Sequence, residues 1–154
     1  MTERVKFVAD CMLGKLAKWL RMLGFDTLYI PDADDDELVR LAVRENRVLL
    51  TRDSRLSDRR MVRSRCVLVR WGSTSEQLRQ VVKQMNLGID QNALFTRCTI
   101  CNSPIVPLSR SDVKGRVPPY VYETQHDYGY CAQCNKIYWR GTHVERVLRA
   151  LERI

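Results

Sequence analysis

The chain has 154 residues, of which 45% are hydrophobic and 29% charged, and its formal net charge at pH 7 is +8. This length suits one domain, or one domain with a small added module, and allows a hydrophobic core without disulfides. No apolar run approaches the roughly 20 residues of a membrane span and no signal peptide is recognisable, so we expect a cytoplasmic protein without a membrane partner. The basic charge fits an acidic partner such as nucleic acid, and fits an ordinary solvated surface equally well.

The first part of the chain alternates between strand patterns and helix patterns. Strands are predicted at residues 5–9, 27–30 and 47–51, and a helix at about 12–22, where apolar side chains recur every three or four residues and Gly24 follows as the stop. A second helix is expected to begin at the capping pattern Asp34-x-x-Glu37 and to end near Glu45. This alternation predicts parallel strand pairing in an α/β fold.

A basic tract leads from the third strand to a fourth strand at 66–69. A capping box, Ser73-x-x-Glu76, then opens a helix that we expect to stop near Gly88. The polar residues 90–92 are interpreted as a linker. We therefore divide the chain into an α/β domain at 1–90 and a second unit at 91–154.

The second unit contains four of the six cysteines, arranged as Cys98-x-x-Cys101 and Cys131-x-x-Cys134 with 29 residues between the pairs. Two such pairs predict a zinc ribbon with a closed set of four thiolates, in which Zn²⁺ is structural rather than catalytic. Prolines and glycines between the pairs indicate short β-segments, such as residues 120–122, and Thr142-x-x-Glu145 is expected to cap a last helix. The two remaining cysteines, Cys11 and Cys66, are expected to be buried thiols.

Aspartates follow two of the predicted strands. Asp10 comes directly after the first strand and Asp53 after the third, while Asp34, Asp35 and Asp36 precede the second helix. Because the carboxyl ends of parallel strands meet at one edge of a sheet, these carboxylates converge there and favour a hard cation, Mg²⁺ or Mn²⁺, that activates water against a phosphodiester. Taken singly, Asp10 and Asp53 are better explained as helix N-caps.

Several side chains near these aspartates have two interpretations. Thr51 is expected to orient Asp53 through its hydroxyl, or is simply a β-branched strand residue. Tryptophans 19, 71 and 139 either stack on bases or, as such rings more often do, pack in cores. The basic candidates either contact RNA or are solvated charges, and Arg21 is expected to lie off the apolar face of its helix; these candidates are Lys15, Lys18, Arg21, Arg52 and Arg55.

A combination of segments extends over essentially the whole chain. These segments are residues 7–26, residues 48–56, Cys98-x-x-Cys101, residues 117–120, and Cys131-x-x-Cys134 followed by residues 138–143. In this order they resemble the Mut7-C ribonuclease domain family, a PIN-like domain with a C-terminal zinc ribbon. The resemblance implies a three-layer α/β/α fold with a parallel sheet, followed by a small β-rich zinc ribbon. It also implies RNA as the target and hydrolysis that depends on Mg²⁺ or Mn²⁺.

The family's acidic residues fall on particular positions of this sequence. The resemblance places the first acid on Asp10, the second on Asp35 with Asp36 as the alternative register, and the third on Asp53. Asp26 matches an acid before the second strand, and a fourth acid has only Asp58 as a candidate. This gap leaves open a non-catalytic RNA-binding module with structural zinc, and a protein partner or an oligomer stays open as well.

Overall fold

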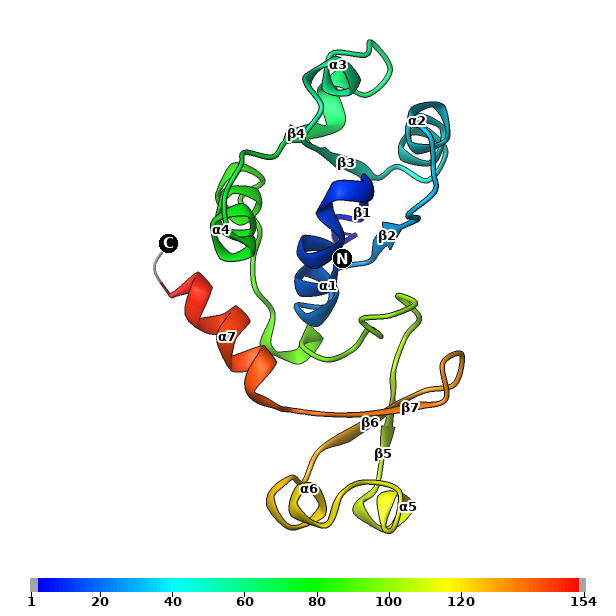
Figure 1. The fold of residues 1–154 in the computed structure, drawn as a ribbon, viewed down its shortest axis with the longest axis vertical. Helices are drawn as coiled ribbons and strands as arrows, with labels where there is room; N and C mark the ends of the chain where they lie inside the picture. The colour runs from blue at the N-terminus through cyan, green and yellow to red at the C-terminus, as the bar shows by residue number, and fades with distance from the viewer. Residues whose placement is uncertain (1–2, 153–154) are drawn as a thin grey trace.

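The structure, a computed structural model, describes residues 3–152 of the chain, which form two units stacked along the long axis (Figure 1). The larger unit contains a parallel sheet with the strand order β2-β1-β3-β4. Its strands are β1 (Phe7–Ala9), β2 (Thr27–Tyr29), β3 (Val48–Thr51) and β4 (Cys66–Leu68). The predicted fold, a three-layer α/β/α sandwich with a small β-rich module after it, is confirmed.

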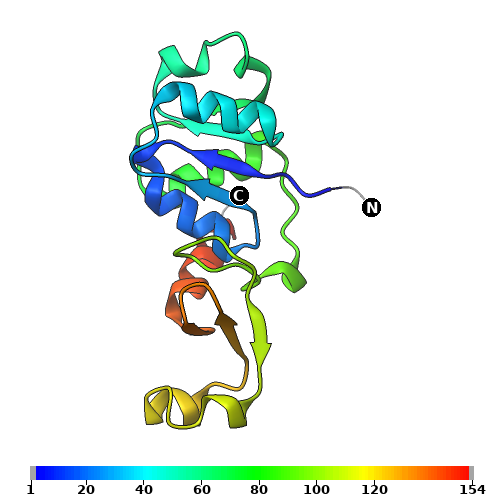
Figure 2. The ribbon, with the colours of Figure 1, turned by 90° about the vertical axis from the view of Figure 1, so that its right-hand side faces the viewer.

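Helices cover both faces of the parallel sheet, as Figure 2 shows for the cyan α2 and the blue α1 on opposite sides. One face is covered by α1 (Gly14–Met22), α4 (Thr74–Gln84) and α7 (Thr142–Leu151), and the other by α2 (Asp35–Arg44) and α3 (Ser54–Ser57). Single 3₁₀ turns lie at η1 (Cys11–Leu13), η2 (Arg63–Arg65) and η3 (Gln91–Ala93). Because both faces are covered, all three residues of β1 are buried, which explains the continuous apolar runs of the strands.

Two helix stops can be compared with their predictions. Gly24 follows α1 with a φ of 90°, and a Cβ there would lie 2.2 Å from the carbonyl oxygen of Ala93, so both the turn and the close linker require glycine. The capping box at Ser73 and Glu76 is confirmed. The predicted stop at Gly88 is wrong, because α4 ends at Gln84 and Asn86 makes the left-handed turn with a φ of 51°.

The smaller unit is built on an antiparallel sheet with the strand order β5-β6-β7. Its elements are β5 (Val106–Leu108), α5 (Arg110–Val113), α6 (Pro119–Thr124), β6 (Tyr128–Cys131) and β7 (Lys136–Trp139). The prediction of a β-segment at residues 120–122 is wrong, because these residues belong to α6. Pro119 stands at the first helical position, where its fixed φ and missing N–H favour the start of a helix.

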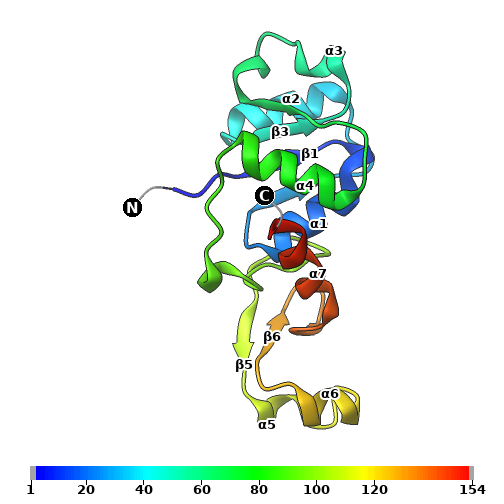
Figure 3. The ribbon, with the colours of Figure 1, turned by 90° about the vertical axis from the view of Figure 1, so that its left-hand side faces the viewer.

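The chain returns from the smaller unit to the larger one through α7, which lies beside α4 in Figure 3. Val147 belongs to the same buried cluster as Leu20 and Val81, so this helix completes the core under the parallel sheet. The predicted cap at Thr142 is wrong, since Gly141 is the N-cap and provides no side-chain bond.

The division of the chain at residue 90 stays a prediction. No helix within residues 3–152 is long and apolar enough to cross a membrane.

Candidate functional site

Asp10 lies at the carboxyl end of β1, where its side chain is buried and held by three donors. One carboxylate oxygen accepts the N–H of Met12 at 3.0 Å, and the other accepts the Thr51 hydroxyl and the N–H of Arg52, the latter at 3.1 Å. Thr51 was predicted to orient Asp53 through its hydroxyl. The hydroxyl instead donates to Asp10 and accepts the backbone N–H of Asp53 at 3.0 Å. These bonds join the ends of β1 and β3 and fix the orientation of the Asp10 carboxylate.

Asp53 and Asp34 cap the helices that follow them. The Asp53 side chain is exposed and accepts the N–H of Arg55 at 2.9 Å, at the start of α3. The Asp34 side chain accepts the N–H of Glu37 at 2.8 Å, at the start of α2. Capping by these aspartates, expected as an alternative to metal binding, is therefore present in the structure. It engages one oxygen of each carboxylate.

Asp35 and Asp36 occupy the first turn of α2 and pair with Arg59. The guanidinium of Arg59 bonds to Asp36 and lies 4.0 Å from an oxygen of Asp35. The hydrogen bond and the charge of Arg59 lower the pKa of the Asp36 carboxyl below its usual value. Nothing in the sequence pattern indicated this pairing, because Arg59 comes 23 residues after Asp36. Arg59 neutralises part of the negative charge at this edge of the sheet.

The fold places three of the predicted acids at one edge. Because β1, β2 and β3 are parallel, Asp10, Asp53 and the start of α2 with Asp35 all follow carboxyl ends of strands. Within residues 3–152, however, only the four cysteines form a group of metal-ligating side chains whose donor atoms all lie within 4.8 Å of one another. Asp10, Asp35 and Asp53 therefore lie at the sheet edge where α/β proteins bind ligands, but their carboxylate oxygens do not form such a group.

The two remaining acidic candidates lie elsewhere. Asp58 is exposed and forms the C-cap of α3. Asp26 precedes β2 and therefore lies at the opposite, amino edge of the sheet, where it pairs with Arg47 at 2.8 Å. Asp26 does not join the acids at the carboxyl edge.

An exposed tryptophan and an arginine lie at the same carboxyl edge. Trp71, which follows β4, is 81% exposed, and the guanidinium of Arg52 lies over its indole ring. The Nε of Arg52 is buried without a hydrogen-bond partner among residues 3–152. The tryptophans were expected to pack in cores, which holds for the partly buried Trp19 and Trp139 but not for Trp71. Its position shortly after β4, which ends at Leu68, was the available signal, by the same rule that located the aspartates.

The other basic candidates divide into two groups. Lys15, Lys18 and Arg55 are exposed. Arg21 is buried, contrary to the expectation that it lies off the apolar face of α1. Its guanidinium donates to the carbonyl oxygens of Thr27 at 2.8 Å and Thr99 at 2.8 Å, so it ties α1 to the cysteine module.

The four predicted cysteine ligands are gathered in one cluster. The Sγ atoms of Cys98 and Cys134 are 3.9 Å apart, and those of Cys101 and Cys131 are 3.5 Å apart. Tetrahedral zinc with bonds of about 2.3 Å would separate its sulfur ligands by about 3.8 Å. Burial alone would raise the pKa of the Cys101 thiol, but hydrogen bonds with Ser103 and the neighbouring cysteines outweigh it and lower the pKa to about 6. The cluster can hold a metal such as zinc.

The remaining cysteines are not buried as expected. Cys11 is exposed, and Cys66 is about half-buried at the start of β4. Burial, followed by the charge of Asp10, raises the pKa of the Cys66 thiol to about 11. Cys66 is therefore protonated and unreactive near neutral pH.

A polar junction joins the first cysteine pair to the edge strand β2. The side chain of Asn102 accepts the N–H of Thr27 at 3.0 Å and donates to Asp26 at 2.7 Å. Burial alone would raise the pKa of the Asp26 carboxyl, but hydrogen bonds from Arg47 and Asn102 and the charges of Arg47 and Arg97 outweigh it and lower the pKa. Asp26 therefore stabilises the junction most in its ionised form.

The Asp26→Asn variant should lose about 1–2 kcal/mol of unfolding free energy at pH 7, because it loses charged hydrogen bonds. Since the folded pKa of Asp26 is below the unfolded value of about 3.9, the stabilisation is complete above that pH and disappears as the pH falls through the folded value. Urea denaturation of both proteins from pH 7 to pH 3 measures this difference. A constant difference over that range would contradict the assignment, and the comparison between the two proteins cancels acid-induced loss of zinc.

Comparison with known proteins identified a family. A sequence model described as Mut7-C RNAse domain matches residues 5–151, nearly the whole chain. No curated protein and no solved structure matches the chain. The matched region includes Asp10, Asp35 and Asp53 at the sheet edge and all of the clustered cysteines.

Proposed function

The chain belongs to the Mut7-C RNAse domain family, which indicates a nuclease-like role, and we propose that it is a metal-dependent ribonuclease. The observation that carries the proposal is the placement of Asp10, Asp35 and Asp53 at the carboxyl edge of a parallel sheet, where α/β enzymes bind their ligands. We propose that its substrate is RNA, that a metal ion bound by these aspartates is required for cleavage, and that the protein is cytoplasmic.

Asp10, Asp35 and Asp53 would hold Mg²⁺ or Mn²⁺, because hard cations prefer carboxylate oxygens. When bound, the ion supplies neutralisation of phosphate charge and acidification of the attacking water. Thr51 and the N–H of Arg52 hold the Asp10 carboxylate in place before any substrate arrives. The other two acids are exposed and reachable from solvent.

Basic and aromatic side chains at the same edge would hold the RNA strand. Arg52, Arg55, Lys15 and Lys18 would contact phosphates, which positions a strand without reading its sequence. Arg21 is left out, because its buried guanidinium is already bonded to backbone carbonyls. Trp71 offers an exposed ring for stacking on a base near Asp10.

Truncating Trp71 to Ala should raise the KM for RNA cleavage about tenfold and leave kcat nearly unchanged. The reason is that base stacking on an exposed ring contributes to binding in the ground state and the transition state alike. Steady-state kinetics on a labelled single-stranded RNA give both constants. Trp71→Phe keeps an aromatic ring and should recover most of the affinity; an unchanged KM in Trp71→Ala would remove Trp71 from the site.

We assign the four clustered cysteines to a structural Zn²⁺. Four protein thiolates fill a tetrahedral shell and leave no position for water or substrate. The hydrophobic core of this module is small, with only four buried residues in its cluster, so metal binding would supply much of its folding free energy.

A non-catalytic RNA-binding module is the second candidate, and a specific observation favours it. Asp10, Asp34 and Asp53 each cap a helical turn, and Asp35 and Asp36 pair with Arg59, so each of these five acids has a structural partner. This candidate predicts RNA binding that weakens with salt and no turnover.

Incubation with labelled single-stranded, hairpin and transfer RNAs distinguishes the two candidates. Mn²⁺ or Mg²⁺ is compared with buffer lacking added divalent ions, and zinc content is measured to verify that the cysteine module is intact. Cleavage that requires the added ion supports the ribonuclease. Salt-sensitive binding of the same RNAs without cleavage at any metal concentration would establish the binding module instead.

A further inference from the structure

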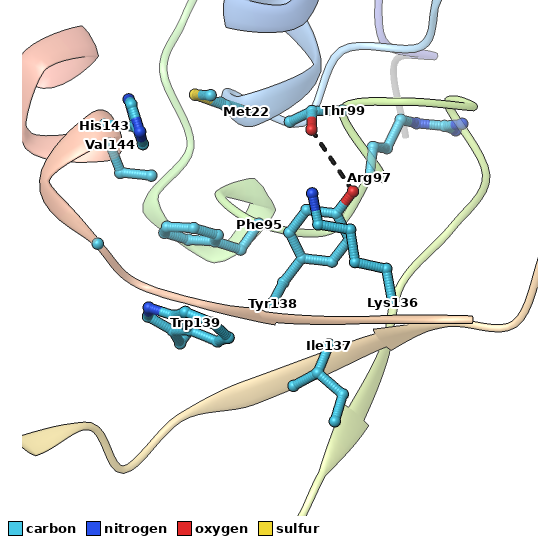
Figure 4. A pocket seen from close by; sticks show the side chains of 11 residues that line it. Met22, Phe95, Arg97, Thr99, Lys136, Ile137, Tyr138, Trp139, His143 and Val144 are labelled. Atoms are coloured by element: carbon cyan, nitrogen blue, oxygen red, sulfur yellow. Dashed lines mark hydrogen bonds between the residues drawn. The ribbon is translucent and has the colours of Figure 1, made fainter. Parts of the chain in front are cut away.

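A cavity of about 220 Å³ lies between the two units, away from Asp10, Asp35 and Asp53 (Figure 4). Its walls come from three parts of the chain that are distant in sequence: Met22, residues 95–99 and residues 136–144. Met22 at the end of α1 and His143 and Val144 of α7 lie across it from β7, and Phe95 enters from the linker. The cavity is smaller than the roughly 300–1,000 Å³ of sites for drug-sized ligands, so it suits a single ring system.

Two aromatic rings in this cavity are held in fixed positions. Phe95 has a φ of 62°, which is a strained backbone conformation for a bulky residue and persists only where the surroundings impose it. Its N–H donates to the carbonyl oxygen of Met22 at 3.2 Å. The hydroxyl of Tyr138 lies 2.9 Å from the Sγ of Cys98, which anchors this ring to the cysteine cluster. The cavity therefore presents preorganised aromatic walls.

The polar side chains around the cavity are cationic or neutral. Arg97, Lys136 and His143 are among the eleven lining residues, which include no Asp or Glu. Arg97 donates to the carbonyl oxygen of Asn102 at 2.9 Å, whereas Lys136 and His143 are exposed to solvent. A cavity with aromatic walls, and with the Lys136 ammonium and the His143 imidazole at its opening, matches a planar base attached to phosphates.

We propose that this cavity binds one unstacked base of a single-stranded RNA, between Phe95 and Tyr138, with neighbouring phosphates at Lys136 and His143. A second copy of this chain fits poorly, because each copy has a net charge of +8 and like charges would meet at the opening. An apolar peptide side chain would make no use of the Lys136 ammonium or the His143 imidazole. The inference rests on the proposed RNA target and is independent of cleavage.

The test measures RNA binding by the Asp10→Asn protein in buffer without added Mg²⁺ or Mn²⁺, so that the RNA stays intact and zinc is retained. Fluorescence anisotropy with a labelled 12-nucleotide single-stranded RNA gives the Kd. Phe95→Leu, which removes the ring and keeps an apolar side chain, should weaken binding about tenfold. Tyr120→Leu is the matched control, because Tyr120 is 72% exposed on α6, and it should change Kd less than twofold.

Two further measurements keep the test decisive if Phe95→Leu folds poorly. The double variant Lys136→Ala/His143→Ala changes only exposed side chains and should weaken binding about fivefold, with a smaller dependence on salt. RNA containing 5-bromouridine should crosslink on irradiation to Phe95 or to the peptide 136–143. Unchanged affinity in the double variant, or crosslinks confined to other peptides, would overturn the proposal.

The outcomes separate this inference from the ribonuclease proposal. Metal-dependent cleavage by the wild-type protein together with unchanged binding by the cavity variants would contradict only the base-binding cavity. Crosslinking at the cavity without cleavage of any RNA by the wild-type protein would contradict only the ribonuclease.

Discussion

Replacing Asp10 by Asn is expected to lower metal-dependent RNA cleavage by about 10²- to 10⁴-fold and to leave the protein folded. A metal ion contributes several kcal/mol of charge stabilisation in phosphodiester hydrolysis, and each 1.36 kcal/mol changes the rate tenfold. Asn has nearly the same shape and keeps one oxygen as an acceptor, so part of the bonding to Met12, Thr51 and Arg52 survives. The negative charge with which Asp10 is proposed to hold the cation is lost.

The measurement is a single-turnover cleavage rate with saturating Mn²⁺ on the RNA that the wild-type protein cleaves best. Asp127→Asn is the matched control, because Asp127 is exposed in the smaller unit and lies outside the aspartate group. Zinc content and circular dichroism should be unchanged in both variants. Cleavage by Asp10→Asn at the wild-type rate would remove Asp10 from the metal site and leave its role as a cap of η1.

The parallel sheet could be predicted because local patterns and topology agree. Buried strands produce apolar runs, helices produce a period near 3.6, and right-handed crossovers then bring the residues after each strand to one edge. Asp10 and Asp53 could be located by this reasoning without any knowledge of their contacts. The four cysteines were equally predictable, because tetrahedral coordination by two short pairs requires their particular spacing.

Contacts between distant segments could not be predicted in this way. The α1 pattern gave no reason to separate Arg21 from Lys15 and Lys18, since all three are basic and fall outside the main apolar stripe. Arg21 is buried because carbonyl oxygens of the first cysteine loop lie across from it, 78 residues further along the chain. The pairing of Arg59 with Asp36 and the stacking of Arg52 on Trp71 likewise depend on the tertiary fold.

The smaller unit was the least predictable part. Its strands are three or four residues long, too short for a clear periodicity, and α6 begins at a proline in a region that otherwise suggested β-structure. A module with few buried side chains leaves little hydrophobic pattern in its sequence from which helices and strands can be predicted. The clustering of the four cysteines could therefore be predicted more reliably than the helices and strands between them.

The cysteine loop also protects an edge of the parallel sheet. β2 is an edge strand, and the N–H of Thr27 bonds to the side chain of Asn102 while its carbonyl oxygen accepts from Arg21. An exposed edge strand is a site of unwanted pairing with other chains. Order in the cysteine module and order in the larger unit are therefore linked through this junction.

The Cys131→Ser variant is expected to lose the zinc, which should be present at one ion per chain in the wild-type protein, and with it the fold of the smaller unit. Binding of structural zinc contributes about 10–16 kcal/mol in small zinc modules, more than the core around Val113 and Tyr128 can replace. Hydrogen exchange should show lost protection in β5, β6 and β7. Weaker protection should extend to β2, because Arg21 and Asn102 would lose their partners.

Cys11→Ser is the matched control, since Cys11 is exposed and lies outside the cluster, and it should keep its zinc and all of its protection. Full zinc content in Cys131→Ser would exclude the four-thiolate site. Loss of zinc with unchanged exchange in β5–β7 would show that the module folds without metal. Loss of protection in β5–β7 alone, with β2 unaffected, would instead show that the junction is too weak to link the two units. The extent of the change in β2 thus measures how far metal binding stabilises the sheet that carries Asp10 and Asp53.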